Sequence, residues 1–105
     1  MKKKTTKVTA VIELKITPAK DTGFAKIAQK IARFPQVEAC FLMSGAYDLL
    51  VFVSGKSLED VAFFVSAELA TIEGVLSTAT SFTLKTYKAK GVLADFPGDN
   101  RLVVV

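Results

Sequence analysis

Residues 37–53 read VEACFLMSGAYDLLVFV, and this stretch decides the predicted fold of the chain. Two runs of β-prone residues, 37–43 and 47–53, are separated only by the Ser-Gly-Ala linker at 44–46. Two such runs joined by a short linker that contains glycine are typical of a β-hairpin. The second run ends in the apolar residues 49–53, so both faces of that strand need to be covered.

The segments on either side of this hairpin each add one strand and one helix. Residues 8–16 place apolar side chains at every second position, the period of a half-buried strand, and residues 75–87 form a last long strand. Each expected helix carries an apolar stripe that repeats every three or four residues, which buries one side of a helix. The stripes are Phe24, Ile27, Ala28 and Ile31 in the first helix and Leu58, Val61, Ala62, Val65, Leu69 and Ile72 in the second.

Residues that suit helix ends flank both stripes. Asp21 or Thr22 can cap the first helix. Ser57 opens the second helix in a capping-box arrangement with Asp60, and Gly74 suits the position just past its end. The order of elements is therefore β-α-β-β-α-β. This order predicts an α+β, ferredoxin-like sandwich in which two helices cover one face of an antiparallel sheet.

The opposite face of that sheet would be open to water in a monomer. Burying apolar area is worth roughly 25 cal/mol per Å², and the strand at 47–53 is apolar on both faces. We therefore expect two copies to pack sheet to sheet as a dimer. The mean hydropathy of +0.38 is high for a small chain and agrees with a buried interface. Phe63 and Phe64 cannot both face one core, so one of them should be exposed for a subunit contact.

The composition excludes several classes of function. The 105 residues make one domain, and four of the 14 basic residues are lysines within residues 1–7, so the rest of the chain is neutral overall. No basic face for nucleic acid follows from this, and we expect no direct DNA binding. There is no histidine, and Cys40 is the one cysteine, which excludes His/Cys zinc sites and histidine acid–base chemistry. No apolar run is long enough to span a membrane. We expect a cytoplasmic protein without a metal or cofactor.

The two ends differ from the middle of the chain. Residues 1–7 are expected to be a flexible basic tail, residues 8–88 the folded domain, and residues 89–105 a C-terminal extension. The extension ends in the apolar residues 102–105, and an exposed β-prone end is prone to aggregate unless it is paired. We expect the extension to add an edge strand or to pack on a neighbouring subunit.

Three motifs follow one another in a single register. They are VEAC with SGAYDLLV at 37–40 and 44–51, then Gly-Val at 74–75, then Thr-Ala-Thr at 78–80. Together, over about residues 8–88, they resemble the effector-binding domain of the Lrp/AsnC family of regulators. This module is also called the regulation-of-amino-acid-metabolism (RAM) domain.

The resemblance implies an assembly and a ligand. Family members carry an N-terminal helix-turn-helix, but only seven residues precede the first expected strand, so the resemblance is to the stand-alone members. In the family the module dimerises through its sheets, the dimers form rings that are often octamers, and amino acids bind between dimers. The resemblance thus implies a homo-oligomer with an amino-acid effector and, by mixed assembly, a full-length Lrp/AsnC regulator as a partner.

The expected ligand-binding residues are the linker of the hairpin, its flanks and two threonines of the last strand: Met43, Ser44, Gly45, Ala46, Tyr47, Asp48, Thr78 and Thr80. Gly45 permits the positive φ of a turn and also exposes backbone N–H groups to a ligand carboxylate. Asp48 interrupts an apolar strand, so its carboxylate either bonds the hairpin backbone or faces a ligand ammonium group.

The other candidates have two interpretations each. Tyr47 is either a cross-strand aromatic or, as the resemblance implies, part of the effector site. Thr78 and Thr80 share one face of their strand, where threonine reflects β propensity or offers hydroxyls to a ligand. Cys40 is expected to be a small buried residue without a reactive role.

Two other functions are compatible with this fold. The first is a small dimeric ferredoxin-like enzyme, such as an isomerase or a cofactor-free monooxygenase, because a fold does not decide a function. Its only adjacent acid–base candidates are Tyr47 and Asp48, and neighbours on a strand point to opposite faces. The second is a purely structural assembly domain without a ligand.

Overall fold

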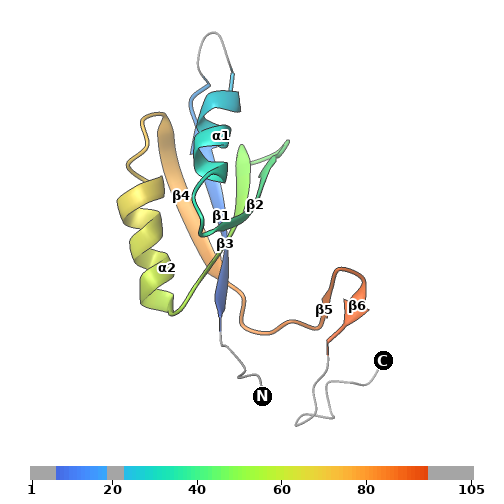
Figure 1. Ribbon diagram of the computed structural model, residues 1–105. Helices are drawn as coiled ribbons and strands as arrows, with labels where there is room; N and C mark the ends of the chain where they lie inside the picture. Colours follow the sequence, from blue (N-terminus) through green and yellow to red (C-terminus); the bar gives the residue numbers. More distant parts are fainter. Residues whose placement is uncertain (1–6, 19–22, 95–105) are drawn as a thin grey trace.

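A four-stranded antiparallel sheet with two helices packed on one face forms the body of the protein (Figure 1). The computed structural model describes residues 7–18 and 23–94. The strand order is β2-β3-β1-β4, so the strand that comes first in the chain lies inside the sheet. The strands are β1 (Val8–Ile16), β2 (Val37–Leu42), β3 (Leu49–Gly55) and β4 (Val75–Phe82). The predicted α+β, ferredoxin-like architecture is confirmed.

The core lies between the sheet and the helices because apolar side chains alternate along the two inner strands. Seven inward side chains of β1 and β3 are buried, and Val8 is partly buried beside them: Ala10, Ile12, Leu14, Ile16, Leu49, Val51 and Val53. β1 pairs with β3 on one side and with β4 on the other. The inward and outward sets therefore follow directly from the period of two that the sequence displays.

Helix α1 (Ala25–Ala32) packs with the predicted stripe against this core. Ile31 is fully buried, and Phe24, Ile27 and Ala28 pack around the core as partly buried residues. The expected caps, Asp21 and Thr22, lie outside the described residues. The residue that precedes the helix is Phe24, whose side chain makes no capping hydrogen bond.

The second helix changes its geometry halfway along. Helix α2 (Leu58–Phe64) continues into η1 (Val65–Leu69), a π-helix in which the amide of Ala70 donates to the carbonyl of Val65 at 2.8 Å. The buried stripe is Val61, Phe64, Val65 and Leu69, so Phe64 and Val65 follow Val61 at the ordinary helical spacing. The predicted membership of Leu58 and Ala62, which lie before the π-turn, is wrong: both are exposed, and Leu58 is 52% exposed.

Phe64, which was not predicted as part of the stripe, is buried in the core. Its ring packs edge-on against Phe34 with centroids 5.2 Å apart, and Phe63 beside it is 71% exposed. The expectation that one of these two rings is exposed is confirmed. The helix ends at Leu69 with Ala70 as its C-cap, so Gly74 does not lie just past its end as predicted. Gly74 has φ +100° in the turn before β4, where a Cβ would lie 2.6 Å from Cδ1 of Ile27.

The last long strand is shorter than predicted. It was expected to reach Tyr87, but β4 ends at Phe82, which pairs with Ala10 of β1. One more bond, from the amide of Thr83 to the carbonyl of Thr9, closes the pairing. The chain then leaves the sheet and forms a small hairpin of β5 (Lys88–Ala89) and β6 (Val92–Leu93), which spans the boundary expected between residues 88 and 89.

The face of the sheet opposite the helices carries an apolar patch. We call this side, formed by the outward side chains of the four strands, the open face. Phe41 and Phe52 pack edge to face on it with ring centroids 6.0 Å apart, yet they remain 50% and 37% exposed. Leu50 and Val11 beside Phe52 are partly exposed. Among the residues that the structure describes, the doubly apolar strand β3 is thus covered on one side only.

The cap of α2 gives a first test. The hydroxyl of Ser57 accepts a 3.0 Å hydrogen bond from the amide of Asp60. Ser57→Ala removes this acceptor and is expected to lower the free energy of unfolding by about 1 kcal/mol in urea titration. Ser66→Ala is the matched control, since that exposed hydroxyl only donates to the carbonyl of Phe63 within the helix. Equal losses in both variants would contradict the capping role.

Candidate functional site

The loop of residues 43–48 joins β2 to β3 at one end of the sheet. Ser44, Gly45 and Ala46 at its tip are all exposed. Gly45 has φ +138°, a conformation that favours glycine, so the predicted turn role is confirmed. No atom lies within 4 Å of the position a Cβ would occupy there. The tip therefore combines a fixed turn with open space above its backbone.

Asp48 anchors this loop to the sheet through three hydrogen bonds. Its amide donates to the carbonyl of Leu14, and its own carbonyl accepts from the amide of Met43, both at 2.9 Å. Its carboxylate oxygen Oδ2 accepts from the amide of Ile16, also at 2.9 Å. Asp48 thus bonds β1 directly, and its bond with Met43 holds the other end of the loop beside it.

The side-chain bond has a local cause in the register of the sheet. β1 extends past the start of β3, and the pairing of β1 with β4 shifts between Lys15 and Ile16. The Asp48 carboxylate supplies the acceptor for the Ile16 amide at this irregularity. The structural interpretation of Asp48 is therefore correct in kind, but its partner is the backbone of β1 and not that of the hairpin. Within the described part of the chain, Oδ1 makes no hydrogen bond.

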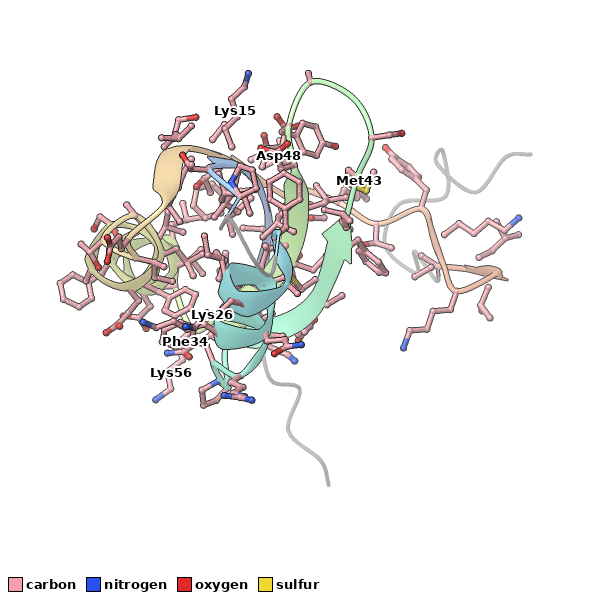
Figure 2. The ribbon with its side chains drawn as sticks, turned by 90° about the horizontal axis from the view of Figure 1, so that it is seen from above. Lys15, Lys26, Phe34, Met43, Asp48 and Lys56 are labelled. Atoms are coloured by element: carbon pink, nitrogen blue, oxygen red, sulfur yellow. The ribbon has the colours of Figure 1, made fainter. Side chains whose placement is uncertain are left out.

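The flanks of the loop lie on the same side of the molecule. Figure 2 shows Met43, Asp48 and Lys15 together on one side of α1, with Lys15 extended into solvent. Sequence patterns did not single out Lys15, because only the register places it beside Asp48. Tyr47 is half-buried, and no ring among the described residues packs against it. The cross-strand aromatic pair considered for Tyr47 is therefore not found.

The two threonines are separated from the loop. Thr78 pairs with Leu14 and Thr80 with Ile12, so both lie on the face that the helices cover. Asp48 bonds β1 from the β3 side, whereas the threonines flank β1 from the β4 side. Both are half-buried. Within one chain the structure brings residues 43–48 together and does not bring Thr78 and Thr80 to them.

A pocket separate from the loop of residues 43–48 lies beside α1. Its volume is about 420 Å³, and it runs between α1 and the turn before β4. Lys26 and Lys30, spaced i and i+4 on α1, border it together with Glu73, above an apolar floor of Ile27 and Ile72. The i, i+4 spacing of these two lysines was the only feature of the sequence that pointed to this pocket.

Neither Cys40 nor the carboxylates of the described residues form a reactive or metal-binding site. Burial raises the pKa of the Cys40 thiol, which disfavours the reactive thiolate. Cys40 is half-buried and faces α1, with its sulfur 4.0 Å from the carbonyl of Ala28. Among residues 7–18 and 23–94, no three carboxylate or thiol side chains cluster in a way that could hold a metal ion. In the same residues, no helix is long and apolar enough to cross a membrane.

Comparison with known proteins identifies the family. The family model described as the Lrp/AsnC ligand binding domain matches residues 9–93, which include every strand and helix of the body except Val8 at the start of β1. The chain belongs to the Lrp/AsnC family. The HTH-type transcriptional regulator YugG of Bacillus subtilis is 47% identical over 98 residues, which cover 93% of this chain and 59% of YugG. The chain spans about half the length of the other regulators it matches.

Solved structures agree with this assignment. A crystal structure of the transcriptional regulator NMB0573 of Neisseria meningitidis in complex with L-Met has a TM-score of 0.68 at 28% identity and covers 83% of this chain and 56% of that one. TTHA0845 of Thermus thermophilus has a TM-score of 0.70 at 26% identity and covers 78% of this chain and 99% of that one. The fold of this chain therefore accounts for nearly the whole of one solved chain.

The anchoring role of Asp48 can be separated from its charge. Asp48→Ala leaves the part-buried amide of Ile16 without an acceptor, and the free energy of unfolding should fall by about 1–3 kcal/mol. Asp48→Asn keeps a carbonyl oxygen at that position and should lose less than half as much. Urea titration of both variants measures the difference. Equal losses would show that the negative charge, and not the hydrogen bond, stabilises the loop.

Proposed function

We propose that this Lrp/AsnC domain binds a small effector, an amino acid, at the loop of residues 43–48 and assembles into dimers and rings through which binding is coupled to regulation. The observation that carries the proposal is the loop itself. Its tip is exposed and open, while its base is fixed to the central strand by Asp48. A rigid base with an unfilled tip is the arrangement expected of a binding loop on a stable scaffold.

The loop offers groups that match both ends of an amino acid. The backbone around Gly45 leaves room for a ligand carboxylate to approach N–H groups, because no side chain stands over it. The Oδ1 atom of Asp48 is an acceptor for the ammonium group, since Oδ2 is already used by Ile16. Met43 and Tyr47 flank these polar groups with apolar and aromatic surface. Thr78 and Thr80 lie on the other side of β1 from the loop. In this proposal the ligand therefore contacts the loop residues rather than the two threonines.

The open face supports the dimer. Phe41 and Phe52 form an exposed aromatic pair, and Leu50 and Val11 extend the apolar patch around them. Two sheets that pack face to face would bury this patch in each copy at once. A second tier of contacts, between dimers, would then place the loop of one dimer against a neighbouring dimer and complete the side-chain pocket. An octameric ring is the arrangement that the family resemblance implies.

A ligand that contacts two dimers links occupancy to assembly. If an effector strengthens the contact between dimers by some factor, assembly strengthens effector binding by the same factor. The relatives are HTH-type transcriptional regulators, which supports a regulatory role for this domain. Mixed assembly with a full-length Lrp/AsnC regulator would carry the signal to DNA. Family membership equally supports a domain that is not an enzyme, because these relatives are regulators.

An amino-acid screen tests the effector site. Thermal unfolding in the presence of each of the twenty amino acids, followed by static light scattering, should show stabilisation by a few of them in an assembly larger than a dimer. Asp48→Asn and Tyr47→Leu should reduce that shift at least by half, whereas Ser66→Ala on the exposed side of the helix should not. A ligand shift that both loop variants leave unchanged would place the site elsewhere. A shift from none of the twenty would contradict an amino-acid effector.

The dimer contact has a test of its own. Phe52→Asp places a charge at the centre of the apolar patch, and size-exclusion chromatography with light scattering should then report the mass of one chain, 11.3 kDa. Phe63→Asp, at an exposed ring on the helical side, should leave a species of at least twice that mass. A Phe52→Asp protein that still dimerises would show that the sheets are not the contact.

A further inference from the structure

The pocket beside α1 combines charged margins with an apolar floor. It lies between α1 and residues 72–74, and Figure 1 shows the segment from α2 to β4 at the same end of the molecule as the start of α1. We call it the α1 pocket. Its volume of about 420 Å³ lies within the usual range of small-molecule sites. The loop of residues 43–48 contributes none of its lining, so the α1 pocket is a separate site.

The wall and the floor of the α1 pocket are fixed by the backbone. The amide of Thr17 donates to the carbonyl of Gly74 at 2.8 Å, and the amide of Val75 donates to the carbonyl of Ile72 at 3.0 Å. A Cβ on Gly74 would lie 2.6 Å from Cδ1 of Ile27, so glycine allows this turn to approach α1 closely. Ile72 is buried and Ile27 is half-buried. The pocket therefore has a preformed apolar floor.

Two lysines place positive charge at the margin that α1 forms. Lys26 and Lys30 lie one turn apart on the helix, and both are exposed. Like charges at this spacing disfavour a helix, and Lys26 also lies in the first turn, where positive charge opposes the helix dipole. Within residues 7–18 and 23–94, neither ammonium group makes a hydrogen bond or an ion pair. Helix stability does not explain this pair, and an anion beside both would offset their repulsion.

The charge on the opposite margin limits which anion fits. Glu73 borders the α1 pocket from the turn before β4, facing the lysines across the floor. A ligand carboxylate beside the lysines is attracted, whereas a second carboxylate at the far end of the ligand is repelled by Glu73. Between the margins, the isoleucine floor suits a hydrocarbon chain. The lining therefore fits a molecule with one negative charge and an apolar chain.

We propose that the α1 pocket binds a small monocarboxylate with an apolar chain. The carboxylate lies beside Lys26 and Lys30, and the chain rests on Ile27 and Ile72. Such a ligand needs no ammonium group, so this site selects a different class of molecule from the loop of residues 43–48. The inference does not depend on the proposed amino-acid site or on the dimer, because a single chain supplies all of these contacts.

Hexanoate is the probe, and the Cδ1 methyl groups of isoleucine report where it binds. In methyl-TROSY spectra of protein labelled at these groups, the signals of Ile27 and Ile72 should shift with hexanoate, while Ile12, fully buried in the core, should not. At constant ionic strength, the affinity should rise about fourfold for each methylene added from butanoate to hexanoate. Adipate, which ends in a second carboxylate, should bind more weakly than hexanoate.

Charge variants test the two margins of the pocket. The double variant Lys26→Gln and Lys30→Gln should weaken hexanoate binding about fivefold, as expected for two exposed ion pairs. The matched control, Lys15→Gln and Lys56→Gln, removes the same charge from exposed positions outside the pocket and should leave the affinity unchanged. Glu73→Gln should strengthen the binding of adipate more than that of hexanoate. Circular dichroism of each variant checks that the fold is retained.

Three results would overturn the proposal. Signals of Ile27 and Ile72 that do not move at the highest hexanoate concentration would show that the pocket stays empty. An affinity that is independent of chain length would show that the lysines attract any anion and that the floor holds no chain. Equal weakening in the two double variants would show that only the net charge of the protein matters. None of these results bears on amino-acid binding at the loop.

Discussion

The central position of strand β1 is the constraint on which the rest of the structure depends. β1 pairs along its length with β3 and β4, and its inward side chains from Ala10 to Ile16 are buried. The helices can cover the sheet only because these side chains present a continuous apolar surface. The bond between the Asp48 carboxylate and the Ile16 amide extends the same constraint to the loop, because it fixes the base of the loop to the best-supported strand of the fold.

This arrangement separates the tasks of the domain in space. One face of the sheet makes the core with α1, α2 and η1, and the other face leaves an aromatic pair and a row of polar side chains exposed. The loop of residues 43–48 lies at the end of the sheet, outside both layers. A stable scaffold with an accessible end suits the proposed function, in which effector binding is transmitted between subunits.

The boundaries of the elements show where local patterns stop being informative. Phe64 lies in the core and Leu58 outside it, and no residue type announces the π-turn of η1 that follows them. β4 ends at Phe82, which pairs with Ala10 of β1, although the sequence after it stays β-prone. In both places the outcome depends on what lies opposite the segment, which a single run of sequence does not contain.

The sequence by itself determined the order β-α-β-β-α-β, the inward apolar side chains of β1, the Ser57 cap, the glycine turn at Gly45 and the family, because each of these depends on spacing along the chain. Only the tertiary structure decided that Asp48 bonds β1, that Lys15 stands beside it and that Thr78 and Thr80 lie across the strand under the helices. These depend on the register between strands that are far apart in the chain. A shift of one residue in that register would exchange every inward side chain for an outward one.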